Sequence, residues 1–199
     1  MRETLCEISA NAGITKPKVI CLKLNYIVTS DLINIRITKP DDLDYVIKTE
    51  QNEENVIFIT PWTQEQHRES INGNDSLHLI IEGSFSAPIG YMIINGINNK
   101  NRSVELMRIV VSNKGKGYGK VAIRLIQKYI FNELHAHRLW LDVKEKNHRA
   151  RKIYEDLGFQ YEGTLRECIK SNDGFESLII MGMLKREFES IINEGRDFT

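Results

Sequence analysis

The sequence lacks three features that would each place it in a particular class of protein. No run of about 18 apolar residues occurs, so no membrane-spanning helix is predicted. Lys and Arg together number 27, and so do Asp and Glu, so overall charge gives no argument for nucleic acid or an anionic membrane as a partner. The three cysteines, Cys6, Cys21 and Cys168, form no C-x-x-C pair, so neither a disulfide framework nor a zinc site is predicted. Recognition of a ligand must therefore be local.

The N-terminal region lacks the pattern of a secretory signal. Glu7 interrupts the apolar character before a signal core builds up, and Lys23 interrupts the apolar run at 19–28. A reduced, cytoplasmic setting is therefore the default expectation. Residues 1–33 carry little pattern beyond a candidate strand at 19–28, and we expect them to form an N-terminal extension. Residues 34–199 are expected to form one domain, because 199 residues with 41% hydrophobic content favour a single core.

Apolar periodicities predict the secondary structure of this domain. Seven strands are predicted, at 33–37, 77–81, 89–94, 104–111, 138–143, 160–169 and 176–184. Four helices are predicted, one after the Lys-Pro-Asp-Asp sequence at 39–42, one at 63–71, one after Gly119 and one at 147–157. This order of elements predicts an α/β fold.

A glycine-rich segment between a strand and a helix is the most informative part of the sequence. Residues 114–120 read Lys-Gly-Lys-Gly-Tyr-Gly-Lys and follow an apolar strand. Glycines at a helix start leave backbone N–H groups bare at the positive end of the helix, and three lysines add charge. This pattern is typical of a phosphate-binding turn. A tight strand-to-helix turn without a ligand is the alternative.

The spacing of these glycines excludes the two common nucleotide motifs. The Walker pattern G-x-x-x-x-G-K-[ST] fails because Val121 follows Gly119 and Lys120. The dinucleotide pattern G-x-G-x-x-G fails because Lys120 occupies the third glycine position after Gly115 and Gly117. Neither ATP nor NAD is therefore predicted as the ligand.

A second segment, at 147–159, reads Asn-His-Arg-Ala-Arg-Lys-Ile-Tyr-Glu-Asp-Leu-Gly-Phe. Its apolar residues share one face of a helix, because they fall at positions i, i+3, i+4 and i+7. They are Ala150, Ile153, Tyr154 and Leu157. Asn147 is a good N-cap for this helix, and Gly158 suits the position just beyond its C-terminus.

The two segments together resemble the two signatures of the GNAT superfamily of N-acetyltransferases. The first is similar to R/Q-x-x-G-x-G/A, with Lys114 in place of Arg or Gln, and with Gly117 and Gly119 at the glycine positions. The second is similar to N-x-x-A-x-x-x-Y-x-x-x-G-F, with every lettered position filled. The resemblance covers roughly residues 34–185. It implies the GNAT fold, a mixed central sheet of about seven strands flanked by about four helices, with strands that splay apart at the acetyl-CoA site.

The resemblance also implies acetyl-CoA as acetyl donor, an amine as acceptor, and no metal. The cofactor-binding residues that it implies are Ile109, Val110, Val111, Lys114, Gly115, Lys116, Gly117, Tyr118, Gly119, Lys120 and Asn147. The backbone at 109–111 is expected to pair with the pantetheine arm of the cofactor, because splayed strands leave ladder groups without partners.

Strict alternation along the strand at 104–111 would place Glu105, Met107, Ile109 and Val111 on one face. The three successive apolar residues at 109–111 conflict with a strand that is half buried. Burial of both faces explains them, and so does a β-bulge.

Acetyl transfer to an amine requires a base, an acid and a backbone amide that stabilises the oxyanion. Tyr154 fills the tyrosine position of the second signature and is predicted to be the acid, since a neutral phenol can protonate a leaving thiolate. Packing of Tyr154 with Ile153 against the sheet is the alternative. Glu105 matches the position of a catalytic glutamate in several GNAT enzymes and is predicted to be the base, with a pKa raised by apolar neighbours. A surface Glu without a function is the alternative.

The acceptor is less well defined. Residues 50–54 read Glu-Gln-Asn-Glu-Glu, and three carboxylates on the expected acceptor-side loop would attract a cationic amine such as a polyamine. A solvated loop is the alternative. Phe58 and Trp62 either line the acceptor site or pack in the core. His135, His137 and His148 are interpreted as surface histidines rather than metal ligands.

Three functions are compatible with these observations. The first is acetyl-CoA-dependent N-acetylation of a small primary amine, such as a polyamine or an amino acid. The second is acetylation of protein N-termini, because the stretch at 162–167 resembles the branch that contains both ribosomal-protein and spermidine acetyltransferases. The third is a sensor that binds acetyl-CoA without turnover. A homodimer is a further expectation, because the strand at 176–184 is apolar enough to pair with another chain.

Overall fold

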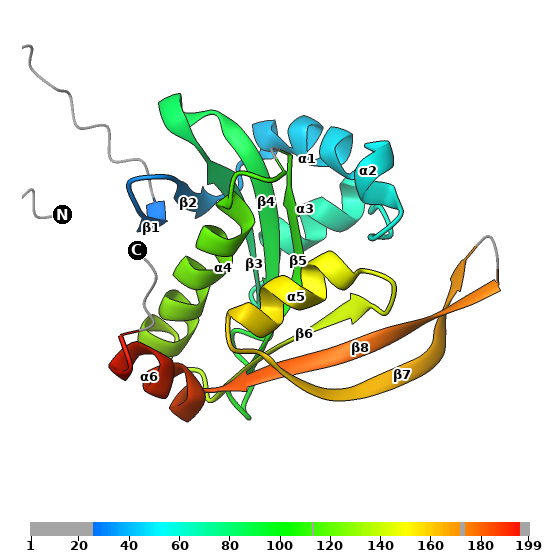
Figure 1. Cartoon of the computed structure of the whole chain (residues 1–199). Helices are drawn as coiled ribbons and strands as arrows, with labels where there is room; N and C mark the ends of the chain where they lie inside the picture. Colours follow the sequence, from blue (N-terminus) through cyan, green and yellow to red (C-terminus); the bar gives the residue numbers. More distant parts are fainter. Residues whose placement is uncertain (1–25, 113, 172–173, 196–199) are drawn as a thin grey trace, which may run out of the picture.

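The computed structural model describes residues 26–112, 114–171 and 174–195, and the strands in these ranges form one eight-stranded sheet (Figure 1). The strands are β1 (Tyr26–Thr29), β2 (Asn34–Ile37), β3 (Ser76–Glu82), β4 (Pro88–Asn95), β5 (Ser103–Val111), β6 (Arg138–Lys144), β7 (Gln160–Ser171) and β8 (Gly174–Leu184). Their order is β1-β2-β3-β4-β5-β6-β8-β7, and neighbours are antiparallel except for β5 and β6. The sheet is therefore mixed, as predicted.

The described residues also form six α-helices. They are α1 (Leu43–Glu50), α2 (Glu53–Val56), α3 (Gln64–Asn72), α4 (Tyr118–Lys128), α5 (His148–Asp156) and α6 (Lys185–Asn193). Short 3-10 turns occupy Pro40–Asp42 and Ser84–Ser86, and a π-turn at Tyr129–Glu133 continues α4. Among the helices of the described ranges, none has the length and apolar character needed to cross a membrane.

The predicted α/β fold is confirmed, and three elements add to it. β1 falls within the segment predicted as an extension and pairs with β2, so the sheet begins before residue 34. The rest of the candidate strand, at 19–25, lies outside the described residues. α2 has four residues, too few for a periodic pattern. α6 follows β8 directly. It was not among the predicted helices, although its apolar residues Phe188, Ile191 and Ile192 recur at helical spacing.

The two faces of the sheet bury different amounts of apolar surface. A large cluster joins the sheet to α4, α5 and α6, and we call this side the α4/α5 face. A small cluster of Val46, Ile80, Tyr91, Ile93 and Val110 lies on the opposite side, which we call the α1/α3 face. The helices on the α1/α3 face contribute few apolar side chains, so polar contacts take a larger share there.

A β-bulge in β5 decides which side chains reach which face. Ile94 of β4 pairs with Leu106 and Ile93 pairs with Arg108, so Met107 is one extra residue on β5. Met107 and Arg108 consequently both lie on the α1/α3 face. Beyond them, Ile109 and Val111 pack on the α4/α5 face, and Val110 packs on the α1/α3 face. The structure therefore contains both features offered for the apolar run at 109–111: apolar clusters cover both faces of the run, and the bulge lies just before it, at Met107.

The bulge corrects the prediction that Glu105, Met107, Ile109 and Val111 share one face. Glu105 is registered with Asn95, next to the pair formed by Leu106 and Ile94 on the α4/α5 face, and therefore points to the α1/α3 face. Ile109 and Val111 point the other way. A base at Glu105 and a cofactor-binding strand at 109–111 thus use opposite sides of the same strand.

The strands β5 and β6 pair over a short stretch and then separate. Their register runs from Ser103↔Arg138 to Glu105↔Trp140, and the rest of each strand has no partner in the other. This separation confirms the splayed strands that the family resemblance implies. Glu105 lies at the narrow end of the gap, and Val111 lies at its wide end beside the glycine turn.

β7 and β8 form a long hairpin that projects from the body of the domain (Figure 1). β8 lies between β6 and β7, so it is an interior strand and the outer edge belongs to β7. The prediction that the strand at 176–184 pairs with another chain is therefore wrong, because this strand already has a neighbour on each side.

Candidate functional site

The glycine turn adopts the conformation that its sequence predicts. Gly115 and Gly117 have φ of 86° and 78°, which L-residues rarely adopt, and a Cβ at either position would meet nothing within 4 Å. Gly117 is the N-cap of α4, so the free N–H groups of the first helical turn face the open space in front of these glycines. A Cβ at Gly119 would lie 3.7 Å from Val111, an ordinary contact. The open turn and the helix start together fit a phosphate group.

The lysines of this turn have different surroundings. Lys116 is exposed. Lys120 Nζ lies 3.9 Å from Asp156 on α5. Lys114 Nζ lies 3.0 Å from the Glu54 carboxylate, and it also donates to the Glu54 backbone carbonyl. Lys114 therefore connects the turn to α2 across the mouth of the gap.

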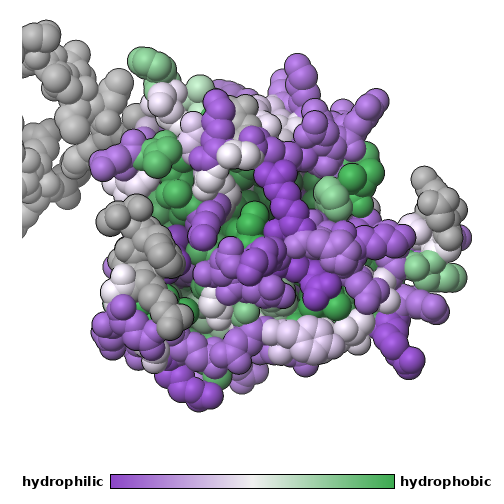
Figure 2. Space-filling model, viewed as in Figure 1, coloured by the Kyte–Doolittle hydropathy of each residue, from purple (hydrophilic) through white to green (hydrophobic). Residues whose placement is uncertain are grey.

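The predicted cofactor strand provides a free backbone edge at the same place. Residues 109–111 of β5 lie beyond the last registered pair with β6, so their groups on that side lack a β6 ladder partner. The side chain of Val110 is buried in the small cluster, so any contact of this residue with a cofactor must involve its backbone. Figure 2 shows apolar surface in a recess between α4 and α5, framed by hydrophilic residues.

Tyr154 reaches this region from α5. Asn147 caps the helix by accepting a hydrogen bond from Ala150 N at 3.1 Å, and Gly158 ends it at φ 90°. The Tyr154 ring is 8% exposed and packs edge-on against Phe159. Its hydroxyl makes no hydrogen bond with any residue of the described ranges. Burial, followed by the charge of Asp142, raises the pKa of Tyr154 above its usual value, so the phenol is neutral at neutral pH.

Glu105 lies on the α1/α3 face at the narrow end of the gap. Asn95 Nδ2 donates to Glu105 Oε2 at 3.3 Å. Burial raises the pKa of Glu105, the Asn95 hydrogen bond opposes this shift, and the charge of Asp142 adds to it. Both effects that raise the pKa bring the carboxyl closer to the range in which a base can act at neutral pH.

Asp142 was not among the predicted site residues. It lies on β6 beyond the last pair with β5, and its side chain is exposed even though burial by the surrounding protein raises its pKa. This combination is typical of the wall of a cleft. Its charge affects both Glu105 and Tyr154, so the three groups surround the narrow end of the gap. The signal for it was a carboxylate between Leu141 and Val143, in the middle of the apolar part of β6.

A buried ion pair on the α1/α3 face was also not predicted. Glu50 Oε1 accepts hydrogen bonds from Tyr91 Oη and Arg108 Nη1, and Glu50 Oε2 accepts one from Trp62 N at 2.7 Å. Burial alone would raise the pKa of Glu50, but the contact with His67, the hydrogen bond from Tyr91 and the charge of Arg108 lower it to about 2. Glu50 is therefore ionised at neutral pH.

The position of Glu50 corrects the expectation for residues 50–54. Its carboxylate is in the core and paired, so it cannot attract a solvent-borne cation. Glu53 and Glu54 are exposed, and Glu54 is occupied by Lys114. The prediction that these carboxylates attract a cationic acceptor is therefore wrong for Glu50 and is weakened for Glu54.

A row of polar contacts extends from this ion pair to Thr38, the residue that follows β2. His67 Nε2 lies 3.4 Å from Glu50 Oε2, His67 Nδ1 lies 3.0 Å from His78 Nε2, and His78 Nδ1 lies 2.8 Å from Thr38 Oγ1. Burial, followed by the proximity of His67, lowers the pKa of His78 to about 4. Every contact has one donor if Thr38 donates to His78, His78 donates to His67, and His67 Nε2–H points to Glu50. We assign these tautomers from the contacts.

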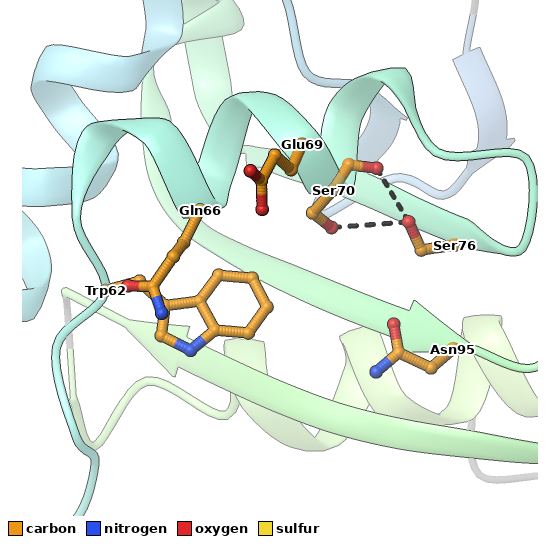
Figure 3. A pocket seen from close by; sticks show the side chains of 6 residues that line it. All are labelled: Trp62, Gln66, Glu69, Ser70, Ser76 and Asn95. Carbon is orange, nitrogen blue, oxygen red and sulfur yellow. Dashed lines mark hydrogen bonds between the residues drawn. The ribbon is translucent and has the colours of Figure 1, made fainter.

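Arg108 connects the same network to a groove on the α1/α3 face. Its Nη2 donates to Thr60 O at 2.9 Å, and its Cζ lies 4.8 Å from the centre of the Trp62 ring. The groove, of about 330 Å³, is lined by Trp62, Gln66, Glu69, Ser70, Ser76 and Asn95 (Figure 3). Trp62 therefore lines a cavity, whereas Phe58 is exposed and lies outside this lining.

The remaining candidates lie at the surface. His135, His137 and His148 are exposed, as expected for loop and first-turn histidines. Cys168 is exposed on β7, and Cys6 and Cys21 lie outside the described residues. The ranges that the structure describes contain no group of three side chains that could hold a metal ion.

Comparisons with known proteins agree with this geometry. The family model described as Acetyltransferase (GNAT) domain matches residues 33–160. The spermidine N(1)-acetyltransferase of Vibrio cholerae is 28% identical over 126 residues, which cover 63% of this chain and 73% of that protein. A putative ribosomal N-acetyltransferase, YdaF of Bacillus subtilis, is 26% identical over 175 residues, covering 79% of this chain and 93% of that protein. The structure of the Vibrio cholerae enzyme with CoA and spermine superposes with a TM-score of 0.73 at 24% identity, covering 80% of this chain and 99% of that one.

Proposed function

We propose that this chain, which belongs to the GNAT family of acetyltransferases, transfers the acetyl group of acetyl-CoA to the primary amine of a small molecule. Family membership and N-acetyltransferase activity follow from the match over residues 33–160 and from the relatives. The observation that carries the proposal is the gap between β5 and β6, with the glycine turn at its wide end and Glu105, Asp142 and Tyr154 around its narrow end.

GNAT enzymes use acetyl-CoA, which supplies a thioester carbonyl. In this chain, the turn at 114–120 and the first N–H groups of α4 would hold its phosphates. The free backbone edge of Ile109, Val110 and Val111 would pair with its amide-containing arm. Asn147 stays a prediction as a cofactor residue, since its side-chain oxygen already caps α5.

Glu105 and Tyr154 would move the two protons. Glu105 accepts a proton from the ammonium form of the acceptor, and the neutral amine forms the new C–N bond as the C–S bond breaks; the nitrogen then releases its second proton, which restores the phenol of Tyr154. Tyr154, kept neutral by burial and by Asp142, donates its proton to the leaving sulfur. Burial, with a smaller contribution from the charge of Asp142, raises the pKa of Glu105 and so makes its carboxylate a stronger base.

Two acceptor classes are supported by the relatives. The spermidine acetyltransferases of Vibrio cholerae and Escherichia coli favour a polyamine. The putative ribosomal N-acetyltransferase favours a protein N-terminus as the second candidate. A cytoplasmic location and self-association stay predictions; a relative from Vibrio cholerae forms a dodecamer.

The test is acetyl-CoA-dependent thiol release with a panel of polyamines, amino acids and N-terminal peptides. Tyr154→Phe is expected to lower kcat by a factor of ~100 or more, as for removal of an acid. Tyr161→Phe is the matched control, because its hydroxyl contacts Thr164 on the exposed hairpin, and its rate should equal that of the wild type. Saturable CoA binding without turnover of any small amine would contradict the proposal, and turnover of peptides alone would move it to the second candidate.

A further inference from the structure

We infer that the groove on the α1/α3 face binds the acceptor, and that it selects amines with a second cationic group, which Glu69 holds. This inference rests on the proposed function and adds the location and the chemistry of the acceptor site. It concerns residues of α3, β3 and β4 that the sequence motifs do not include.

The groove is aligned with the predicted base. Ser76 of β3 is registered with Asn95 of β4, and Asn95 is registered with Glu105 of β5. Paired residues point to the same face, so these three side chains form a row on the α1/α3 face. Neighbouring strands lie about 4.8 Å apart, so the row spans about 10 Å from Ser76 to Glu105.

The lining of the groove is suited to ammonium groups. None of its six side chains is a cation. Ser76 Oγ donates to Ser70 O at 2.6 Å and lies 3.3 Å from Ser70 Oγ, so one of its lone pairs remains as an acceptor. Glu69 lies beside Ser70 at the end of the row that is remote from Glu105, and Figure 3 shows its carboxylate on the groove side of α3. Glu105 does not line the groove, but it ends the row that continues from Asn95, so carboxylates lie at both ends of the row and match a linear molecule with a cation at each end.

The apolar wall of the groove is fixed before any ligand arrives. The Trp62 backbone N–H is bound by the buried Glu50, and the indole ring packs against Arg108 and His67. A preformed wall lowers the entropy cost of binding a flexible chain. The volume of about 330 Å³ is at the lower end for ligand sites, which favours an alkyl chain over a folded or extended peptide.

Asn95 connects the two ends. Its amide nitrogen holds Glu105, and its side chain also lines the groove. An amine that lies along the row would therefore reach Glu105 from the α1/α3 face, while the free edge of β5 faces the gap. Acceptor and acetyl donor would then approach from different directions, which a direct transfer requires.

The experiment measures kcat/KM of the full-length protein for alkane diamines of increasing length and for monoamines of the same length. Long diamines are expected to exceed their monoamines by about fivefold, the value of one exposed ion pair, and short diamines that cannot span the row should behave as monoamines. Glu69→Gln should remove this advantage, so that kcat/KM for long diamines falls to the value for their monoamines.

Glu65→Gln is the matched control. Glu65 is on the same helix, is paired with Arg68 at the surface, and does not line the groove. The same loss of charge there should leave the diamine advantage intact. Equal rates for diamines and monoamines, or an equal effect of Glu69→Gln on both, would overturn the inference while leaving the enzyme active. Absence of turnover with every amine would instead count against the proposed function.

Discussion

On the α4/α5 face, the predicted cofactor site is built from contacts that are close in sequence, whereas on the α1/α3 face the acceptor side is built from contacts between distant residues. The glycine turn, the start of α4 and the cap of α5 each fall within one short segment. Glu50 and Arg108 are separated by 58 positions, and His78 and Thr38 by 40. The first face has a large apolar core, and the second depends on a buried charge pair.

The difference indicates a division of labour in this fold. A site for a common donor can be encoded in local motifs, because its backbone geometry is reused. A site for a particular acceptor must place individual side chains from several elements, so buried polar contacts fix its walls. Stability on the α1/α3 face and the shape of the acceptor site therefore depend on the same residues.

Replacement of Glu50 by Gln should have the largest effect. Arg108 would stay buried without its counter-ion, so the free energy of unfolding should fall by about 3–5 kcal/mol. Urea denaturation measures this change. Glu53→Gln, at an exposed position next to α1, should stay within about 0.5 kcal/mol.

The pair of Glu50 and Arg108 also predicts how the free energy of unfolding depends on pH. Because the folded pKa of Glu50 is lowered to about 2 from 4.5, its contribution is complete above pH 4.5 and is lost as the pH falls toward 2. The difference in stability between wild type and Glu50→Gln should shrink over that interval. A difference that stays constant with pH would show that Glu50 does not carry the charge.

Glu105→Gln should reduce kcat by a factor of ~100, because the base is removed. In the wild type, activity should fall as the pH drops through a pKa above 4.5, and the variant should lose this acidic limb of the pH–rate profile.

Asp142→Asn should move the acidic limb of the pH–rate profile to lower pH, because a negative neighbour no longer raises the Glu105 pKa. Glu145→Gln, an exposed carboxylate just after β6, is the control. An unchanged limb in Glu105→Gln would assign the base elsewhere.

Gly117→Ala should affect the cofactor face alone. A Cβ at φ 78° costs about 1–2 kcal/mol or forces the turn to move, and binding of CoA should weaken by about tenfold. Gly195→Ala is the control, since it adds a Cβ at a similar φ of 67° just beyond α6, outside the predicted cofactor site. Calorimetric titration with CoA distinguishes the two, and equal affinities would exclude this turn as the phosphate site.

The N-caps of α3 and α5 give the smallest expected effect, and the same loss of stability is expected at both. Thr63→Ala on α3 and Asn147→Ala on α5 should each lower the free energy of unfolding by about 1 kcal/mol. If Asn147 also contacts the cofactor, its variant alone should bind CoA more weakly. Equal CoA binding by both variants would reduce Asn147 to a cap.

The sequence predicted what is local and periodic. Seven of the eight strands, the helices α1, α3, α4 and α5, the cap at Asn147 and the glycine turn were predictable, because each depends on neighbouring residues. An apolar run alone does not distinguish burial of both faces from a bulge, and the structure contains both features near 109–111. The pairing of Glu50 with Arg108 and of His67 with His78 was beyond prediction, because no spacing rule connects residues of α1, α3, β3 and β5. To predict Asp142 as a site residue, one would have to know where β5 and β6 separate.

The splayed strands have a cost that concerns solubility. Beyond Glu105, β5 is an edge strand in the middle of a sheet, with backbone groups that β6 does not pair. Unpaired edges recruit extended segments of other chains, which is why proteins shield them with charges, bulges or covering elements. An element that covered this edge of β5, as one can cover an outer edge, would block the proposed entry for substrate. A ligand that pairs with this backbone would therefore protect the protein from aggregation as well as take part in its chemistry.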